Sequence, residues 1–231
     1  MNNRYSIEDV KKLVSDSSAL LFDFDGTLVN LDKLNVDSFA LVFKEMFSID
    51  FSREDFMKYI SGRGSKNGIV EYLQTKGIKE FSGVEINNQF YTHKKRLIEE
   101  RIDNEIYLLP GIKDFLNNSK IKEKRKIIVT SSRKEHVKKM LTHFNLFDNF
   151  ETVIDRYDVV RGKPDPECFL KGLEYLGLRS SQCLVFEDSF YGLQASKGAD
   201  IFTIGILNDG WNEDFVYQLS DFVIENYSVL I

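Results

Sequence analysis

Two aspartates placed two positions apart, Asp23 and Asp25, follow the apolar run ALLF (19–22). Side chains two positions apart lie on the same side of an extended strand, so both carboxylates are expected to face one space just beyond it. A buried carboxylate without a partner is costly, and two close together repel each other. Gly26 and Thr27 also suit a hydrogen-bonded turn at a strand exit, so this pair alone fits either a turn or a reactive site.

Further along the chain, three hydroxyl residues and a lysine are candidates for binding an anion. Thr130, Ser131 and Ser132 follow an apolar run, and hydroxyls with backbone N–H groups at a strand-to-helix junction suit an anion. Ser132 or a neighbour could instead simply cap the following helix. Lys163 lies in RGKPDPE (161–167), where two prolines stiffen the chain before a helix, and a compact lysine charge suits phosphate. The alternative is a solvated lysine beside a helix-starting proline.

A second pair of acids, Glu187 and Asp188, follows the apolar run CLVF before another helix-like segment. Acids at a helix start are favoured by the helix dipole, so this pair also has a purely structural explanation. Three aspartates gathered around one point, however, are tolerable only if a hard cation joins them. Mg2+ prefers oxygen ligands, so we predict a magnesium site formed by Asp23, Asp188 and the backbone carbonyl of Asp25. In that site the ion and Lys163 neutralise the acids.

The elements that would position these residues alternate along the second half of the chain. Apolar runs typical of buried strands are separated by segments with apolar residues at helical spacing, which predicts an α/β fold with a mostly parallel sheet covered on both faces. With right-handed crossovers, the carboxyl ends of the strands meet at one edge, where such sheets bind their ligands. The predicted strands are 126–132, 152–159, 183–189 and 200–206, and the predicted helices between them are 133–144 and 166–177.

Residues 32 to about 108 interrupt this alternation. They form amphipathic helical patterns with no convincing strand, and we predict a helical insertion over the edge of the sheet. The segment LLPGIKDFL (108–116) would return the chain to the sheet, with Pro110 and Gly111 opening a helix. The polar run NNSKIKEKRK (117–126) is expected to be a solvated helix end and loop. The predicted division is a core of residues 1–30 and 109–231 and an inserted helical domain of residues 31–108.

Composition limits the class of protein. The chain has 231 residues, 42% hydrophobic and 29% charged, as in an ordinary globular protein with a sizeable core. Its net charge of -5 argues against a nucleic-acid partner, and no apolar run is long enough to span a membrane. Cys168 and Cys183 are too few for a disulfide framework. The N-terminal stretch lacks the apolar run of a signal peptide, so we expect a cytoplasmic protein. We also expect a monomer or a weak dimer.

Four short motifs follow one another along the chain: DFDGT (23–27), VTSS (129–132), GKPDPE (162–167) and VFEDSFYGLQAS (185–196). Motifs of this kind occur in this order in the haloacid dehalogenase-like hydrolase superfamily, and the chain resembles that family over about residues 16–226. The helical block resembles the cap inserted after the first motif in the branch that contains phosphoglycolate phosphatase and β-phosphoglucomutase. SDFVIENYSVL (220–230) resembles the closing strand of that branch. The resemblance implies a Rossmann-like core with an inserted α-helical cap domain.

The resemblance also implies roles for individual residues. Asp23 would attack phosphorus to form an aspartyl-phosphate, while Asp25 would protonate the leaving oxygen and later deprotonate the attacking water. Thr130 and Ser131 would bind the phosphoryl oxygens, and Lys163 would orient Asp23 and offset charge on the reacting group. The implied metal ligands are Asp23, Asp25, Asp188 and Glu187, the last directly or through water.

The expected function is a Mg2+-dependent phosphatase that hydrolyses a small phosphorylated metabolite, such as a sugar phosphate. Asp25 favours phosphate esters over carbon–halogen bonds, because dehalogenases of the family do not keep the second aspartate. Arg63 and Lys66, in ISGRGSKNGI (60–69), are candidates for contact with an anionic substrate group, or else residues of a solvated helix–helix turn.

Two alternatives remain open. A sugar phosphomutase similar to β-phosphoglucomutase would use the same two aspartates and return the phosphate to the sugar. Residues 30–39 offer Asn35 where those mutases carry a histidine, which disfavours that activity. A binding module without catalysis is the other alternative, and the intact set of motif residues argues against it.

Overall fold

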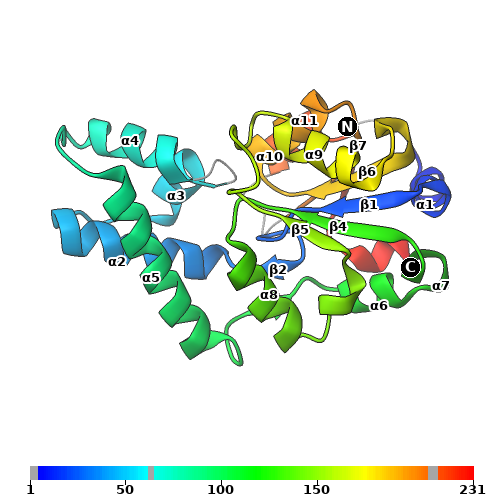
Figure 1. Ribbon diagram of the computed structural model, residues 1–231, viewed down its shortest axis with the longest axis horizontal. Coiled ribbons are helices and arrows are strands. Elements are labelled where there is room, and N and C mark those ends of the chain that lie inside the picture. Colours follow the sequence, from blue (N-terminus) through cyan, green and yellow to red (C-terminus); the bar gives the residue numbers. More distant parts are fainter. Residues whose placement is uncertain (1–4, 62–64, 208–212) are drawn as a thin grey trace. The chain divides into compact units, whose positions relative to one another are not determined.

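A computed structural model describes residues 5–61, 65–207 and 213–231, without the side chains of residues 65–67. Its central feature is a parallel six-stranded sheet with helices on both faces (Figure 1). The predicted α/β class is therefore confirmed. Among the helices described, none is long and apolar enough to span a membrane.

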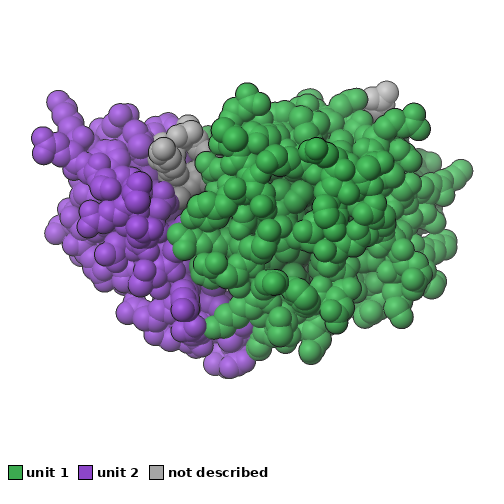
Figure 2. All heavy atoms as spheres, in the orientation of Figure 1, with its two compact units in different colours: residues 1–29, 108–231 green, residues 30–107 purple. Residues whose placement is uncertain are grey.

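The chain divides into two compact units (Figure 2): unit 1, Met1–Val29 with Leu108–Ile231, and unit 2, Asn30–Tyr107. The chain leaves unit 1 through β2 (Val29–Asn30) and returns through β3 (Tyr107–Leu108), and these short strands pair with each other. The sequence analysis found no strand in this part of the chain, because a two-residue strand has too little alternation to be recognised. The role of unit 2 as a cap remains a prediction.

The sheet of unit 1 has the strand order β5-β4-β1-β6-β7-β8, so the first strand of the chain lies at its centre. Each run predicted as a strand lies in this sheet with shorter bounds. The segment predicted at 152–159 pairs only over its first three residues, because the chain then turns into the loop that leads to Lys163. The strands are β1 (Ala19–Phe22), β4 (Arg125–Val129), β5 (Thr152–Ile154), β6 (Cys183–Glu187), β7 (Phe202–Ile206) and β8 (Phe222–Ile224).

Alternate side chains of these strands enter two different layers. Leu21, Ile127 and Val185 belong to an aliphatic core that includes residues of α9 and α10, which cover one face of the sheet (Figure 1). On the other face, the rings of Phe22 and Phe186 stack with centroids 4.8 Å apart. The helices of unit 1 are α1 (Ile7–Asp16), α6 (Ile112–Asn117), α7 (Ser119–Lys122), α8 (Lys134–His143), α9 (Glu167–Leu176), α10 (Phe190–Gly198) and α11 (Glu213–Leu219), with short 3-10 helices η1 (Phe147–Asn149), η2 (Ser180–Gln182) and η3 (Tyr227–Leu230).

Over its described residues, unit 2 consists of helices around an aromatic core. The rings of Phe39 and Phe90 stack with centroids 4.0 Å apart, and those of Phe43 and Tyr72 lie 4.9 Å apart. Offset and tilted ring pairs of this kind add to the free energy gained by burying the rings. The helices are α2 (Asp32–Phe47), α3 (Arg53–Tyr59), α4 (Ser65–Thr75) and α5 (Gly83–Arg101).

We predict above that the polar run 117–126 is a solvated helix end and loop, but part of it is buried. Lys126 is buried, and its ammonium donates hydrogen bonds to the carbonyls of Ile121, Lys122 and Lys124 at 2.9, 2.8 and 2.7 Å. A lysine can satisfy carbonyl groups that a helix end leaves without intrahelical partners. Burial of this charged side chain therefore has a local explanation, as the cap of α7.

Candidate active site

Asp23 stands one residue beyond the end of β1. Its N–H donates to the carbonyl of Phe186 at 3.0 Å, so the parallel pairing of β1 with β6 continues to this position. The register pairs Phe22 with Phe186, which places Asp23 next to Glu187 at the carboxyl edge of the sheet. Gly26 then adopts a φ of 83° and closes a tight turn, a conformation that favours glycine.

A buried lysine joins the two strand ends. Lys163 Nζ donates to Asp23 Oδ1 and to Glu187 Oε2, both at 2.6 Å. The side chains of Lys163, Asp23 and Glu187 are 2%, 9% and 0% exposed. Burying charged groups costs free energy, and their hydrogen-bonded pairing offsets part of that cost.

Electrostatics in this cluster are dominated by burial. Desolvation, and then the charge of Glu187, raise the pKa of Asp23 to about 8, against the opposing effect of Lys163. Burial would lower the pKa of Lys163, but the charges of Asp23 and Glu187 outweigh it and hold that pKa above its ordinary value. Lys163 therefore stays a cation, while Asp23 takes up a proton near neutral pH unless another positive charge is near it.

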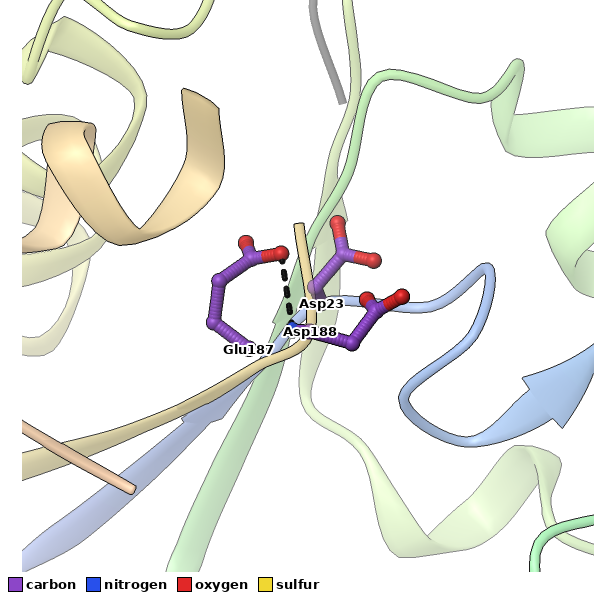
Figure 3. A group of neighbouring side chains, drawn as sticks. All are labelled: Asp23, Glu187 and Asp188. Carbon is purple, nitrogen blue, oxygen red and sulfur yellow. Dashed lines mark hydrogen bonds between the residues drawn. The ribbon is translucent and has the colours of Figure 1, made fainter. Parts of the chain in front are cut away.

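Both oxygens of Glu187 are hydrogen-bonded. Oε2 accepts from Lys163, and Oε1 accepts from the N–H of Ser189 at 3.0 Å and from its hydroxyl at 2.8 Å. Oε1 also accepts from the N–H of Asp188 at 3.1 Å (Figure 3). Gly192 packs against this carboxylate so closely that an added Cβ would lie 2.0 Å from Oε2. Glycine at position 192 is thus explained by the buried carboxylate beside it.

Asp188 completes a group of acids at the ends of β1 and β6 (Figure 3). Asp23, Glu187 and Asp188 each offer a carboxylate oxygen, and these atoms all lie within 4.8 Å of one another. With Lys163, the fully ionised cluster has a net charge of -2, which one divalent cation balances. Oxygen-only donors suit Mg2+. Asp23 and Asp188 are the better-suited ligands, because both oxygens of Glu187 already accept hydrogen bonds.

The loop after β4 carries the predicted hydroxyl residues. Thr130 is buried, and its Oγ1 accepts a hydrogen bond from the N–H of Ser132 at 3.0 Å. The Ser132 hydroxyl donates to Asp25 Oδ2 at 2.7 Å. The N-cap of α8 is Arg133, the neighbour of Ser132, and no side chain makes a capping hydrogen bond there. Ser132 instead links Asp25 to the loop of Thr130.

The predicted residues come from four segments of unit 1: the ends of β1, β4 and β6 and the loop before α9. One contact network joins Asp23, Lys163 and Glu187, with Asp188 beside them, and a second joins Asp25 to Thr130 through Ser132. Ser131 lies half-buried in the same loop as Thr130.

The structure gives no side-chain positions for Arg63 and Lys66, the two residues predicted to contact substrate. Arg63 lies outside the described residues, and Lys66 lies in α4 with its side chain outside the description. Sequence reasoning placed Ser132 among the hydroxyls of a possible anion site but missed its hydrogen bond to Asp25. The only signal was its place, one residue after Ser131 in a run of three hydroxyls.

A family model of haloacid dehalogenase-like hydrolases matches residues 20–206. The chain belongs to this family. A phosphorylated carbohydrates phosphatase from Thermotoga maritima is 30% identical over 196 residues, which cover 83% of this chain and 88% of that protein. A β-phosphoglucomutase from Bacillus subtilis is 28% identical over 193 residues, covering 81% and 82%.

Solved structures give the same fold for this haloacid dehalogenase-like hydrolase. CbbY from Rhodobacter sphaeroides, in complex with phosphate, superposes with a TM-score of 0.79 at 24% identity, covering 91% of this chain and 95% of that one. The predicted superfamily, its Rossmann-like core and the enzyme class, a phosphoric monoester hydrolase, are confirmed. The residue roles, the metal ion and the substrate remain predictions.

Proposed function

We propose that this protein is a Mg2+-dependent phosphatase that acts on a small phosphorylated carbohydrate through an aspartyl-phosphate at Asp23. The observation that carries the proposal is the position of Lys163, which bonds Asp23 and Glu187 at 2.6 Å each inside a group of three buried acids. A purely structural pair would need one carboxylate for one lysine. The surplus negative charge at a sheet edge suits a divalent cation and a phosphoryl group.

In the first step, an oxygen of Asp23 attacks phosphorus while the bond from phosphorus to the leaving oxygen breaks. Lys163 holds Asp23 through Oδ1 and so limits its rotation. Asp25, in its protonated form, gives its proton to the leaving oxygen. A Mg2+ ion held by Asp23 and Asp188 would supply positive charge to the phosphoryl oxygens.

In the second step, Asp25 takes a proton from a water molecule that attacks phosphorus. The bond between phosphorus and Asp23 breaks, and inorganic phosphate leaves the regenerated carboxylate. Thr130 and the N–H of Ser131 bind phosphoryl oxygens in both steps. Glu187 positions Lys163, since one of its oxygens accepts from that ammonium and the other is fixed by Ser189.

The substrate class is proposed from relatives, since a phosphorylated carbohydrates phosphatase is among them. Contact of Arg63 and Lys66 with an anionic group of the substrate stays part of the proposal, as does a cytoplasmic location. A phosphomutase is the rival activity, because a β-phosphoglucomutase is also a relative.

The first test is release of inorganic phosphate from sugar phosphates, phosphoglycolate and nucleoside monophosphates, with MgCl2 or with EDTA. We expect turnover of at least one sugar phosphate with MgCl2 and none with EDTA. Asp23→Asn should lower turnover at least about 1,000-fold. Asp114→Asn, at an exposed acid on α6, is the matched control and should leave turnover unchanged.

The second test identifies the intermediate and separates the rival. Borohydride added during turnover should reduce an aspartyl-phosphate, so peptide mass spectrometry should find homoserine at position 23. Turnover that survives Asp23→Asn would refute the assignment of the nucleophile. Conversion of β-glucose 1-phosphate to glucose 6-phosphate with a bisphosphate primer, without net phosphate release, would instead establish a phosphomutase.

A further inference from the structure

The C-terminal segment of unit 1 places a buried tyrosine under the group of acids. Tyr227, in η3, is 0% exposed, and its ring lies against the rings of Phe115 and Phe186 with centroids 5.3 and 5.4 Å apart. Phe186 directly precedes Glu187 in β6. The phenol therefore lies beneath the strand ends that carry the site, although none of the steps above uses it.

The phenol hydroxyl has a specific partner. Tyr227 donates to the backbone carbonyl of Thr27 at 3.1 Å, and the Thr27 hydroxyl donates to Asp188 Oδ1 at 3.0 Å. Thr27 is 0% exposed, so its carbonyl would lack a donor if the phenol were removed without replacement. Two hydrogen bonds thus connect the C-terminal segment to one of the acids.

The backbone around Tyr227 is itself held in place. Its N–H donates to the carbonyl of Pro110 at 3.1 Å, and a Cβ added to Gly111 would lie 2.5 Å from the backbone nitrogen of Ser228. Close packing on both sides leaves the ring little freedom to shift. The position of the phenol oxygen is therefore fixed by contacts that do not involve the acids.

We propose that Tyr227 is a positioning residue for a divalent cation: it holds Thr27, and Thr27 holds Asp188 in the orientation that the cation needs. The inference rests on the proposed function, since it assigns Asp188 as a ligand. Partners that orient metal ligands typically change metal affinity 10-fold to 100-fold when they are mutated. The phenol is one hydrogen bond further from the cation than Thr27, so we expect a change in affinity at the lower end of that range.

The test is calorimetric titration of the full chain with MgCl2, with no substrate present. Tyr227→Phe removes one oxygen atom and keeps the ring, and it should weaken Mg2+ binding about 10-fold. Tyr175→Phe, at a half-exposed tyrosine on α9, is the matched control and should bind like the wild type. Unchanged affinity in Tyr227→Phe would overturn the inference.

A second pair of variants tests the route through Thr27. Thr27→Val removes the hydroxyl that reaches Asp188 and should weaken Mg2+ binding, while Thr27→Ser should keep it. Adding Tyr227→Phe to Thr27→Val should weaken binding no further, because both act through the same bond. If Thr27→Val binds Mg2+ like the wild type, the inference is overturned even if Tyr227→Phe does not fold. If the wild type binds no Mg2+, the proposed function fails first.

Discussion

Unit 1 and unit 2 have interiors of different chemistry. On the face of the unit 1 sheet covered by α9 and α10, the strands contribute small and branched aliphatic side chains, such as Leu21, Ile127 and Val185. Phe22 and Phe186 place rings on the other face, and charged groups gather where the strands end. In unit 2 the core is made of large rings, with Phe39 in contact with Phe43, Phe51, Phe56 and Phe90. Backbone pairing in a parallel sheet fixes the positions of the strand ends, so charged side chains at those ends are held at defined distances from one another. Packed rings do not fix backbone positions in this way.

Two ion pairs, one from each unit, differ widely in burial. Lys163 and Asp23 are 2% and 9% exposed, while Lys44 and Asp50 of unit 2 are 60% and 91% exposed. Removing one partner of a buried pair costs about 3–5 kcal/mol, against about 0–1 kcal/mol for a surface pair. Burial of Lys163 with two carboxylates is therefore a cost that the proposed reactive site would explain and that stability alone does not require.

The largest expected effect comes from Lys163→Met at pH 8. It leaves Asp23 and Glu187 buried without their cation, so we expect a loss of about 3–5 kcal/mol in the free energy of unfolding. Turnover should fall at least about 1,000-fold. Urea unfolding and phosphate release measure both quantities. Lys44→Met, which removes the exposed lysine of unit 2, should cost less than about 1 kcal/mol and keep turnover. Equal effects of the two variants would break the contrast between the units.

Phe39→Ala tests the other interior. The change opens a cavity among stacked rings and should lower the free energy of unfolding by about 3–5 kcal/mol. Because unit 2 contributes none of the acids described above, Mg2+ binding to the folded variant should stay within about threefold of the wild type. Calorimetric titration at 10 °C checks this. Loss of Mg2+ binding in a folded variant would show that the metal site depends on the core of unit 2.

Gly192→Ala should have a smaller effect that is confined to unit 1. The added Cβ would lie 2.0 Å from Glu187 Oε2, so the carboxylate must move away from Lys163. We expect a loss of about 1–3 kcal/mol in the free energy of unfolding, together with a lower kcat. Gly83→Ala is the control in unit 2, where an added Cβ meets nothing within 4 Å, and it should be neutral or slightly stabilising.

A further prediction, which needs no substitution, is a pH dependence of Mg2+ binding. The pKa of Asp23 is raised from 3.8 to about 8, so this group favours the folded state most below pH 3.8, and that contribution is lost as the pH rises through 8. A cation displaces the proton that the folded protein holds between these values. Mg2+ affinity should therefore rise between pH 6 and pH 8, by at most about tenfold per pH unit, and then level off. A constant affinity over this range would remove Asp23 from the ligands.

The sequence was sufficient to predict which side chains meet at one edge of the sheet. The order of apolar runs and helices predicted a parallel sheet, and Asp23, Lys163 and Glu187 meet at its edge because strands of such a sheet end on one side. The sequence could not predict which group donates a hydrogen bond to which carboxylate oxygen. Adjacent acids such as Glu187 and Asp188 project in different directions, and sequence does not tell which is paired with lysine and which suits a metal.

Contacts between distant parts of the chain were also beyond prediction. Tyr227 reaches Thr27 across 200 positions, and nothing in the run NYSVL marks the tyrosine as a partner of the first motif. Lys126 was expected in solvent because its neighbours are polar, yet three carbonyls at the end of α7 enclose its ammonium. Hydrogen bonds of this kind depend on tertiary packing, which local patterns do not contain.

The central claim is that acids from the first and last motifs share one divalent cation. Calorimetric titration of the wild type and of Asp188→Asn with MgCl2 at pH 8 tests it most directly. We expect one Mg2+ per wild-type chain and at least a 100-fold loss of affinity in Asp188→Asn, with the fold retained by circular dichroism. No binding by the wild type, or equal binding by both proteins, would contradict the account.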